Sequence, residues 1–431
     1  METAVLKTKD KYALSRVMYW LEAAFAYFID ILAGGAFLAK LTSEIGISDS
    51  MTAILTSLTS LAGIAQLFSI YLSHTAPYKR FVIPIMLSAE LIYATLYLIP
   101  FLDMSAEVMS LIFFAAMLTA KLLINIINPL KTTWFMNLVP MKDRGSYTAI
   151  LQVVSLVSGA AVSFGAGHII DNFQANGNLT GAFITLSASI LVFTLANFLT
   201  LIFSREKELT NKRERSKAKD SLKFLAQNKK YKKLILVLLF AAIGNNVITP
   251  FLGTYQVNEL GFSMTFISII SVVFSGISMI FVLFFGKLSR NFQHKTILRI
   301  GYPIVFLSYL LNIFTVPENG AVMFIIYNVI LRIGNAAIAI SSTNILLELT
   351  PPEHQPTALA VNTVITGVLS FIATLAASPL VDYMQSCKNT ISGVTVYAQQ
   401  ILSAVCALFY LILILYYNFR FLPETKKHNE K

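Results

Sequence analysis

Six ionisable side chains stand inside long apolar stretches of this sequence, and we look for chemistry there first. They are three acids and three bases: Glu22, Asp30, Glu90, Lys121, Lys131 and Arg332. A charged group at the centre of a bilayer costs at least about 2.5–3.5 kcal/mol on insertion scales, so each of the six needs a functional or a structural reason. Two kinds of chemistry suit such groups, the binding of protons and the binding of a charged solute.

Asp30 is the strongest candidate for a proton-coupling group. It lies in the middle of its apolar stretch and is followed by Gly34 and Gly35, which allow a helix to bend or to approach a neighbour closely. A cation at Lys121 or Lys131 would hold this carboxylate in its charged form until the site opens to one side. The alternative is a fixed ion pair that holds two helices together.

Glu22 and Glu90 are the other two proton-coupling candidates. Glu22 lies about 9 Å of helix rise into its stretch, so the alternative is that it extends to the nearby membrane surface. The alternatives for Glu90 are that it stays protonated or that it contacts a neighbouring helix. If the acids pair with Lys121 and Lys131, one acid is left over.

Arg332 and Lys121 are candidates for holding an anionic solute. A guanidinium group in mid-span suits a carboxylate or a phosphate, because it can donate two parallel hydrogen bonds. The alternative for Arg332 is an ion pair with Asp30 or Glu90. Lys131 is a further cavity candidate, although it lies close enough to the end of its stretch to reach water.

Uncharged polar residues within the apolar stretches extend this set. Asn245 and Asn246 precede Thr249 and Pro250 and interrupt one stretch, and discontinuous helices are common at transporter binding sites. Four aromatic residues before Asp30 predict an amphipathic cavity, unless they simply pack against other helices: Tyr19, Phe25, Tyr27 and Phe28. The uncharged polar candidates for the cavity are Asn125, Asn128, Gln152, Asn245, Asn246 and Asn335.

The elements that must position these residues are membrane-spanning helices. Of the 431 residues, 56% are hydrophobic and only 13% are charged, where soluble domains carry about 25%. Apolar runs of about 20 residues are long enough to cross a bilayer, and a span must satisfy its backbone polar groups internally, which favours helices. We predict an all-α membrane protein with spans at 16–39, 51–72, 81–101, 107–137, 146–170, 180–203, 233–257, 263–286, 296–315, 320–348, 357–382 and 397–418.

Basic residues divide the chain and orient it. The polar stretch from 204 to 232 is a predicted cytoplasmic linker between an N-terminal bundle (1–203) and a C-terminal bundle (233–431), and within it 218–228 is a predicted short helix. Loops on one side of the spans hold most of the lysines and arginines, whereas the opposite loops hold Lys40 and Lys388. We therefore expect both termini to be cytoplasmic.

The chain also repeats itself. Residues 121–173 align with residues 332–384, so that Lys121 corresponds to Arg332 and Asp171 to Asp382. Both copies have a basic residue in mid-span, a turn centred on proline, a long apolar span and then an acid. Two similar halves in parallel order are a known plan for transporters.

Two short motifs add a resemblance to a known family. The run from Gly286 through Arg290 to Lys295 is similar to a loop motif of the major facilitator superfamily, in which a small residue allows close helix approach and cations meet a helix end. The turn at Pro140, Asp143 and Arg144 also resembles that family. We interpret these residues as parts of a cytoplasmic gating motif.

The resemblance implies a fold and an activity. The fold would be twelve transmembrane helices in two pseudo-symmetric six-helix bundles, with spans one, four, seven and ten around a central cavity. Asp30, Lys121 and Arg332 would then share one space with Asn125, Asn128, Asn245, Asn246 and Asn335. The expected activity is secondary, proton-coupled transport of a small amphipathic or anionic organic solute by alternating access, with export slightly favoured.

Other functions are weighed against this one. An organic-acid uptake symporter, a lysophospholipid-type flippase and a non-transporting scaffold or sensor are the alternatives. No catalytic motif, metal cluster or cofactor motif stands out, so we expect no enzyme activity, no metal and no cofactor. The net charge of +11 comes from loop residues that suit membrane lipids, and we expect no nucleic acid partner. The chain is expected to act as a monomer in a bacterial inner membrane.

Overall fold

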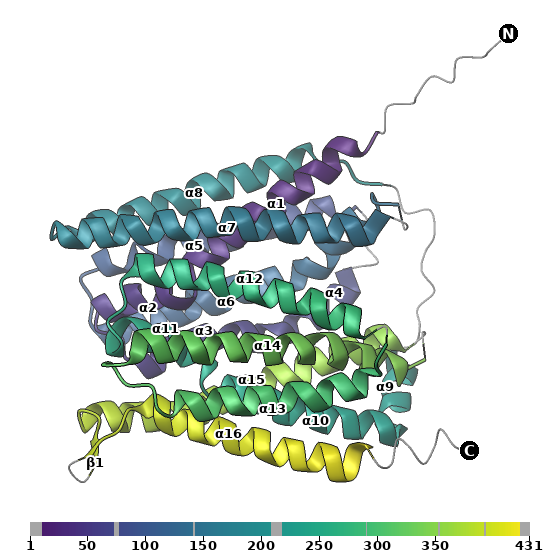
Figure 1. Ribbon diagram of the computed structural model, residues 1–431. Helices are drawn as coiled ribbons and strands as arrows, with labels where there is room; N and C mark the ends of the chain where they lie inside the picture. The colour runs from purple at the N-terminus through teal and green to yellow at the C-terminus, as the bar shows by residue number, and fades with distance from the viewer. Residues whose placement is uncertain are drawn as a thin grey trace.

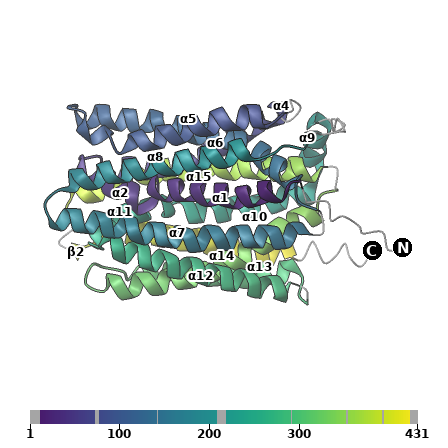
Figure 2. The same ribbon diagram turned by 90° about the horizontal axis from the view of Figure 1, so that it is seen from above.

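The computed structural model describes residues 11–72, 77–140, 143–207, 218–289, 291–351, 354–391 and 394–422. Nearly all of the regular structure is helical, and the long helices run along one common direction (Figure 1; Figure 2 shows the same arrangement from above). Within these residues, ten helical segments are long and apolar enough to cross a membrane. Two further helices, α5 and α13, begin with charged residues and complete the twelve predicted spans.

The N-terminal half contains the first eight α-helices. They are α1 Ala13–Leu32, α2 Gly35–Glu44, α3 Asp49–Ala62, α4 Gln66–Leu72, α5 Lys79–Leu96, α6 Ala106–Met136, α7 Arg144–Ala175 and α8 Leu179–Phe203. Short 3-10 turns stand at η1 Gly63–Ala65 and η2 Ile99–Phe101.

α9 confirms the short helix that the sequence predicts within the linker. After α9, the helices of the C-terminal half follow the same order as those of the N-terminal half. The C-terminal half consists of the helices α9 Ala218–Gln227, α10 Lys229–Asn246, α11 Leu252–Thr254, α12 Met264–Leu288, α13 His294–Asn312, α14 Gly320–Glu348, α15 Gln355–Ser386 and α16 Ala398–Tyr416. It also contains the 3-10 turn η4 Thr249–Phe251, the π-helices η5 Tyr255–Glu259 and η6 Tyr417–Phe421, and a hairpin of β1 Thr390–Ile391 and β2 Val394–Thr395.

The first span of each half is interrupted, as the sequence predicts. Span one breaks between α1 and α2, where Gly35 has φ +53°, a left-handed conformation that glycine adopts without strain. Span seven ends as α10 at Asn246 and resumes through η4, where Pro250 cannot donate a backbone hydrogen bond. The breaks let the outer part of each span follow a different course from the inner part.

The helix bounds confirm the internal repeat. An offset of 211 residues carries both bounds of α7 onto those of α15. The same offset brings α6 close to α14. Large buried cores lie within each half, around Tyr93 and Phe113 in the first and around Tyr302 and Tyr327 in the second.

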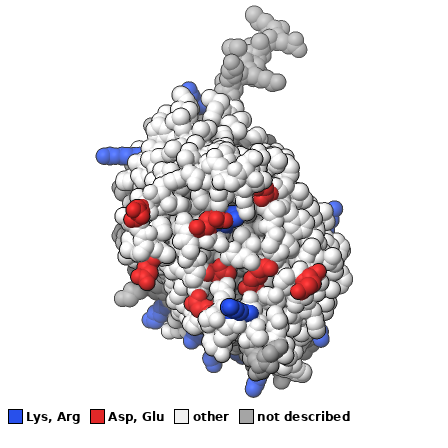
Figure 3. All heavy atoms as spheres, turned by 90° about the vertical axis from the view of Figure 1, so that its left-hand side faces the viewer, with Lys and Arg blue, Asp and Glu red and all other residues white. Residues whose placement is uncertain are grey.

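The two ends of the helical bundle differ. The start of α1 and the end of α16 lie at the same end as α9, which we call the linker end, and the β1–β2 hairpin lies at the opposite end, which we call the hairpin end (Figure 1). The hairpin end displays several acidic side chains and few basic ones (Figure 3).

The halves meet along two helix pairs, which we call seams. One seam is α7 against α12 and the other is α3 against α15. Glycines allow this approach: a Cβ on Gly167 would lie 2.7 Å from the carbonyl oxygen of Met264, and one on Gly367 would collide with the carbonyl oxygen of Ser60.

Candidate functional site

A cavity of about 610 Å³ lies between the two halves. The N-terminal half supplies most of its wall, and α12 supplies the part that comes from the C-terminal half. The wall is largely apolar, with small residues and hydroxyl groups facing each other across the seam. Its lining includes Tyr27, Asp30, Phe37, Thr56, Thr59, Met117, Lys121, Val157, Gly159, Ser163, Ser271, Ser275, Gly276 and Met279.

An ion pair joins α1 and α6 in the wall of this cavity. Lys121 Nζ lies 2.7 Å from Asp30 Oδ1. The lysine side chain is 8% exposed and also lies over the Tyr93 ring, whereas the aspartate side chain is 60% exposed. The Asp30 carboxylate is therefore exposed to the cavity, whereas the Lys121 side chain is buried.

Arg332 stands unpaired on α14. Its side chain is exposed, and within the described part of the chain it forms no ion pair or hydrogen bond. Its charge acts on the hydroxyl group of Tyr27, which lines the cavity from the opposite half. Arg332 itself is not part of the cavity lining.

The expectation that eight polar residues share one space is only partly met. Asp30 and Lys121 line the cavity, and the others do not. Asn245 is held by its own half, because Tyr309 donates to it (2.8 Å) and it donates to Asn335 (3.4 Å).

The remaining amide side chains also lie outside the lining. Asn246 donates to the Ala242 carbonyl within α10. Asn125 accepts from Gln66 of α4 and donates to the carbonyl oxygen of Lys121, one turn back on α6. Asn128 is half-buried on α6, and Gln152 is exposed on α7. Local hydrogen bonds therefore take up several of the groups that could have faced a ligand.

Glu22 and Lys131 form a second ion pair, which is deeply buried. Lys131 Nζ donates to Glu22 Oε1 at 2.6 Å, and the exposed fractions of the two side chains are 11% and 0%. The alternatives that either residue reaches the membrane surface or bulk water are therefore wrong. α1 packs closely against α7 and α8, and the ion pair connects it to α6 in the interior of the N-terminal half.

Glu90 is the acid left over. It is 1% exposed and accepts a hydrogen bond from the Asn197 side chain of α8. Its contact with a neighbouring helix is one of the alternatives stated for it above, and it does not line the cavity.

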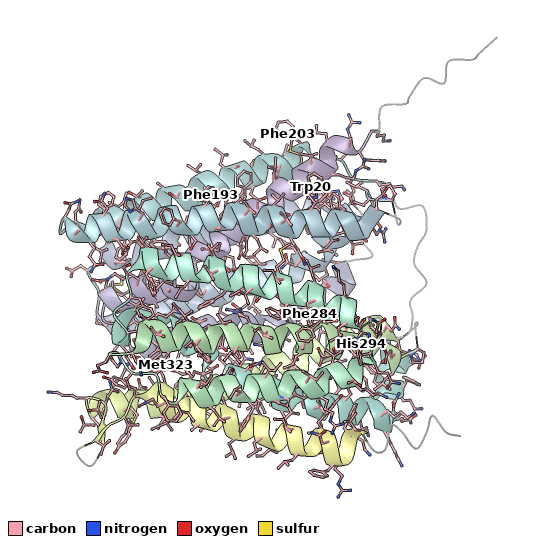
Figure 4. All side chains as sticks on the ribbon, in the orientation of Figure 1. Trp20, Phe193, Phe203, Phe284, His294 and Met323 are labelled. Carbon is pink, nitrogen blue, oxygen red and sulfur yellow. The ribbon has the colours of Figure 1, made fainter. Side chains whose placement is uncertain are left out.

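The aromatic residues before Asp30 mostly pack within the N-terminal half. Tyr19 stacks on Phe135, with ring centroids 4.2 Å apart. Phe25 and Phe28 pack against Phe193 of α8, which is marked in Figure 4. Tyr27 is the one of the four that lines the cavity, where its ring covers Gly159.

The gating motif lies at the linker end. Gly286 brings α12 close to Ile340 of α14, and the charge of Lys295 interacts with Glu348, the last residue of α14. Asp143 occupies the N-cap position of α7, and the Arg144 side chain donates to the carbonyl oxygen of Val139. Arg290 lies outside the described residues.

Sequence reasoning missed the residues that join the halves at the hairpin end. Asp49 of α3 accepts hydrogen bonds from Asn258 and Gln385 of the other half, each at 2.6 Å. Asp171 of α7 accepts the backbone N–H groups of Met264 and Thr265 at the start of α12. The recurrence of Asp171 as Asp382 in the repeat was the available signal.

Comparisons with known proteins agree with this architecture. The family model for the Major Facilitator Superfamily matches residues 20–374. Among solved structures, the chain is similar to the nucleoside transporter NupG, with a TM-score of 0.67, 12% identity and coverage of 94% of this chain and 97% of that chain. It is also similar to a D-xylose–proton symporter, with a TM-score of 0.67, 13% identity and coverage of 93% and 96%.

A third similar structure is a bacterial homologue of the human lysosomal transporter Spinster in an inward-facing, unoccupied conformation. Its TM-score is 0.65 and its identity 14%, with coverage of 96% of this chain and 97% of that chain. No match was found among curated protein sequences.

Proposed function

Because this chain belongs to the Major Facilitator Superfamily and is a secondary transporter, not an enzyme, we propose that it couples proton movement to transport of a small organic solute. The proposed solute is amphipathic or anionic, and the proposed proton-binding group is Asp30. The observation that carries this proposal is the Asp30–Lys121 pair, whose acid is open to the cavity and whose base is buried.

The pair supplies a competition between a proton and a cation. While Asp30 is charged, Lys121 Nζ is satisfied by it at 2.7 Å. A proton on the Asp30 carboxylate removes that charge and releases the ammonium group to bind a carboxylate or phosphate. The unpaired Arg332 provides a second positive charge from the opposite half. Proton and anion would thus be loaded together.

This arrangement favours a second candidate function, symport of an organic acid, over export. The export prediction rests on an aromatic cavity, and three of the four aromatic residues before Asp30 pack elsewhere. The apolar wall still suits an amphipathic solute, because apolar surface and a charged pair meet in one cavity.

Alternating access would use the two seams. At the hairpin end, Asp49 and Asp171 hold residues of the opposite half, so this conformation would admit solute from the linker end. Opening the hairpin end requires those hydrogen bonds to break while the linker end closes.

We further propose a bacterial inner membrane location with the linker end in the cytoplasm. The small number of basic residues at the hairpin end and the basic stretch around α9 support this orientation. The division into bundles 1–203 and 233–431, joined by 204–232, and a monomeric state belong to the same proposal.

The experiment has two stages. A thermal-shift screen of organic acids, lipids and drugs on purified protein identifies a ligand, because a ligand that binds the folded state raises its melting temperature. Purified protein in liposomes then receives an imposed pH gradient. The proposal expects the identified solute to accumulate with the gradient, and solute movement that ignores the gradient would exclude proton coupling.

A further inference from the structure

The repeated acid at the hairpin end, Asp171 in one half and Asp382 in the other, has opposite surroundings at the two seams. Asp171 accepts the N–H groups of Met264 (2.9 Å) and Thr265 (2.8 Å) at the start of α12. A helix N-terminus carries partial positive charge, so it stabilises this carboxylate. Asp382 holds the same position of the repeat on α15, but its charge acts on Asp49, which is itself an acid.

Asp49 links the two halves at the second seam, that of α3 against α15. It is 7% exposed at the start of α3, although it is an acid. Its Oδ1 accepts from Asn258 Nδ2 and its Oδ2 from Gln385 Nε2, each at 2.6 Å. Both donors belong to the opposite half. Asn258 in turn accepts from the hydroxyl group of Ser43 at 2.9 Å.

A second carboxyl group faces Asp49 across this seam. Glu259 follows Asn258 in η5, and its Oε2 atom is buried with no hydrogen-bond partner within the described residues. Its charge opposes that of Asp49, and the side chain of Gln385 faces both groups. The Gln385 amide of α15 donates to Asp49, and the second acid, Glu259, comes from the opposite half to Asp49.

Cations do not relieve this repulsion. Across the residues that the structure describes, no lysine or arginine forms an ion pair with Asp49, Glu259 or Asp382. Lys40 on the adjoining α2 is engaged by Glu44. The other titratable groups that face Glu259 are the uncharged hydroxyl groups of Tyr255 and Tyr397. Two like charges brought together in a buried seam disfavour its closed form, and one proton added to either Asp49 or Glu259 removes the repulsion between these two groups.

We propose that Asp49 and Glu259 form a proton-operated latch at the hairpin end. The seam closes when one of the two carboxyl groups holds a proton taken from water on that side. It opens when both groups are charged, and the proton then returns to the same side. This inference rests on alternating access in the proposed function, but it does not rest on Asp30.

The latch predicts that a lower pH on the hairpin side shifts the transporter toward conformations closed on that side. Such a shift needs neither solute nor a pH gradient, because it follows from proton binding to the seam alone. This property separates it from the coupling proposed at Asp30.

The test measures the width of the hairpin end directly. Spin labels are placed at Asn176→Cys in one half and Thr395→Cys in the other, in a Cys387→Ser background, and both label positions are exposed. Cys406 is fully buried and is not expected to react. Distance distributions are recorded by double electron–electron resonance from about pH 5 to about pH 8.5, the interval over which shifted carboxyl groups titrate.

The expected result is a several-fold rise in the short-distance population as the pH falls. Glu259→Gln should hold that population high at every pH, because the amide removes the repulsion. Asp49→Asn, a second near-isosteric variant, should also lose the pH response, although its amide nitrogen replaces one of the two oxygens that accept hydrogen bonds. Glu318→Gln, an exposed acid at the same end, is the matched control and should keep the pH response of the parent.

Two results would overturn the latch. One is a distance distribution in the parent protein that does not change with pH. The other is a pH response that survives in both Glu259→Gln and Asp49→Asn. Asp30→Asn should retain the response even where it loses proton-coupled transport, so a failure of the coupling proposal leaves this test intact.

Discussion

Lys121 holds Asp30 from a buried position, whereas Asp30 itself is open to the cavity between the halves. The nitrogen and oxygen atoms are 2.7 Å apart, and the two side chains are 8% and 60% exposed. A proton arriving through the cavity can therefore reach the acid without moving the base. This asymmetry distinguishes the pair from Glu22–Lys131, in which neither partner is accessible.

The buried pair is expected to serve stability more than transport. Lys131→Met leaves the Glu22 carboxylate, which is fully buried, without its cation. Removing one partner of a buried pair costs about 3–5 kcal/mol. We expect a large fall in melting temperature, measured by thermal unfolding in detergent.

The double variant Glu22→Gln with Lys131→Met provides the control. It removes both charges from the same site and should recover most of the stability lost by Lys131→Met alone. Equal instability of the single and double variants would show that packing, not the uncompensated charge, sets the cost.

Close approach of the two backbones at the hairpin end predicts the effect of one added methyl group. A Cβ on Gly253 would lie 2.8 Å from the Gly35 carbonyl oxygen. Overpacking costs about 1–3 kcal/mol, which is a change of roughly fivefold to somewhat over hundredfold in a population ratio. Gly253→Ala should therefore favour conformations open at the hairpin end and slow transport.

Labelling of a cavity residue checks this shift. Thr59→Cys in the Cys387→Ser background should react faster with a membrane-impermeant maleimide added on the hairpin side when Gly253→Ala is present. Gly165→Ala is the matched control, because an added Cβ there meets nothing within 4 Å. Unchanged labelling in Gly253→Ala would contradict the prediction.

Arg332 is expected to set the preference for anionic solutes. Hydrogen bonds to charged groups contribute about 1.5–3 kcal/mol, so Arg332→Ala should weaken binding of an anionic ligand by roughly tenfold or more. Arg332→Lys keeps the charge but loses the planar guanidinium group, so its affinity for the anionic ligand should lie between that of the parent and that of Arg332→Ala. Dissociation constants from ligand-dependent melting temperatures measure the effect, and equal affinity in Arg332→Ala would remove the anion site.

Substitutions at Glu90 distinguish a requirement for a hydrogen-bond acceptor from a requirement for a charge. Glu90→Gln keeps an oxygen that can accept from Asn197, so its free energy of unfolding should stay close to that of the parent. Glu90→Leu leaves the buried Asn197 amide unsatisfied and should cost about 1–3 kcal/mol. If both variants lose stability equally, the acidic group itself is required.

Much of the fold follows from periodicity and the repeat. Apolar runs of span length predict the helices, and the alignment of Lys121 with Arg332 anticipates the match between α7 and α15. The pairing of acids on span one with bases on span four also follows, because charges in apolar surroundings need partners.

The details of the site depend on packing that a single sequence does not encode locally. Asn245 does not line the cavity, because its side chain accepts a hydrogen bond from the Tyr309 hydroxyl group of α13. Asp49 and Gln385 meet only because α3 and α15 form a seam between residues far apart in the chain. Neither position shows a local motif, so helical periodicity alone could not identify them.

Proton coupling at Asp30 is tested most directly by gradient-driven flux in liposomes. Asp30→Asn keeps the size of the side chain and removes the charge that a proton neutralises. We expect that an imposed pH gradient no longer drives solute accumulation by Asp30→Asn, while exchange of solute between the two sides without a gradient continues. Accumulation that follows the gradient as strongly in Asp30→Asn as in the parent protein would contradict this expectation.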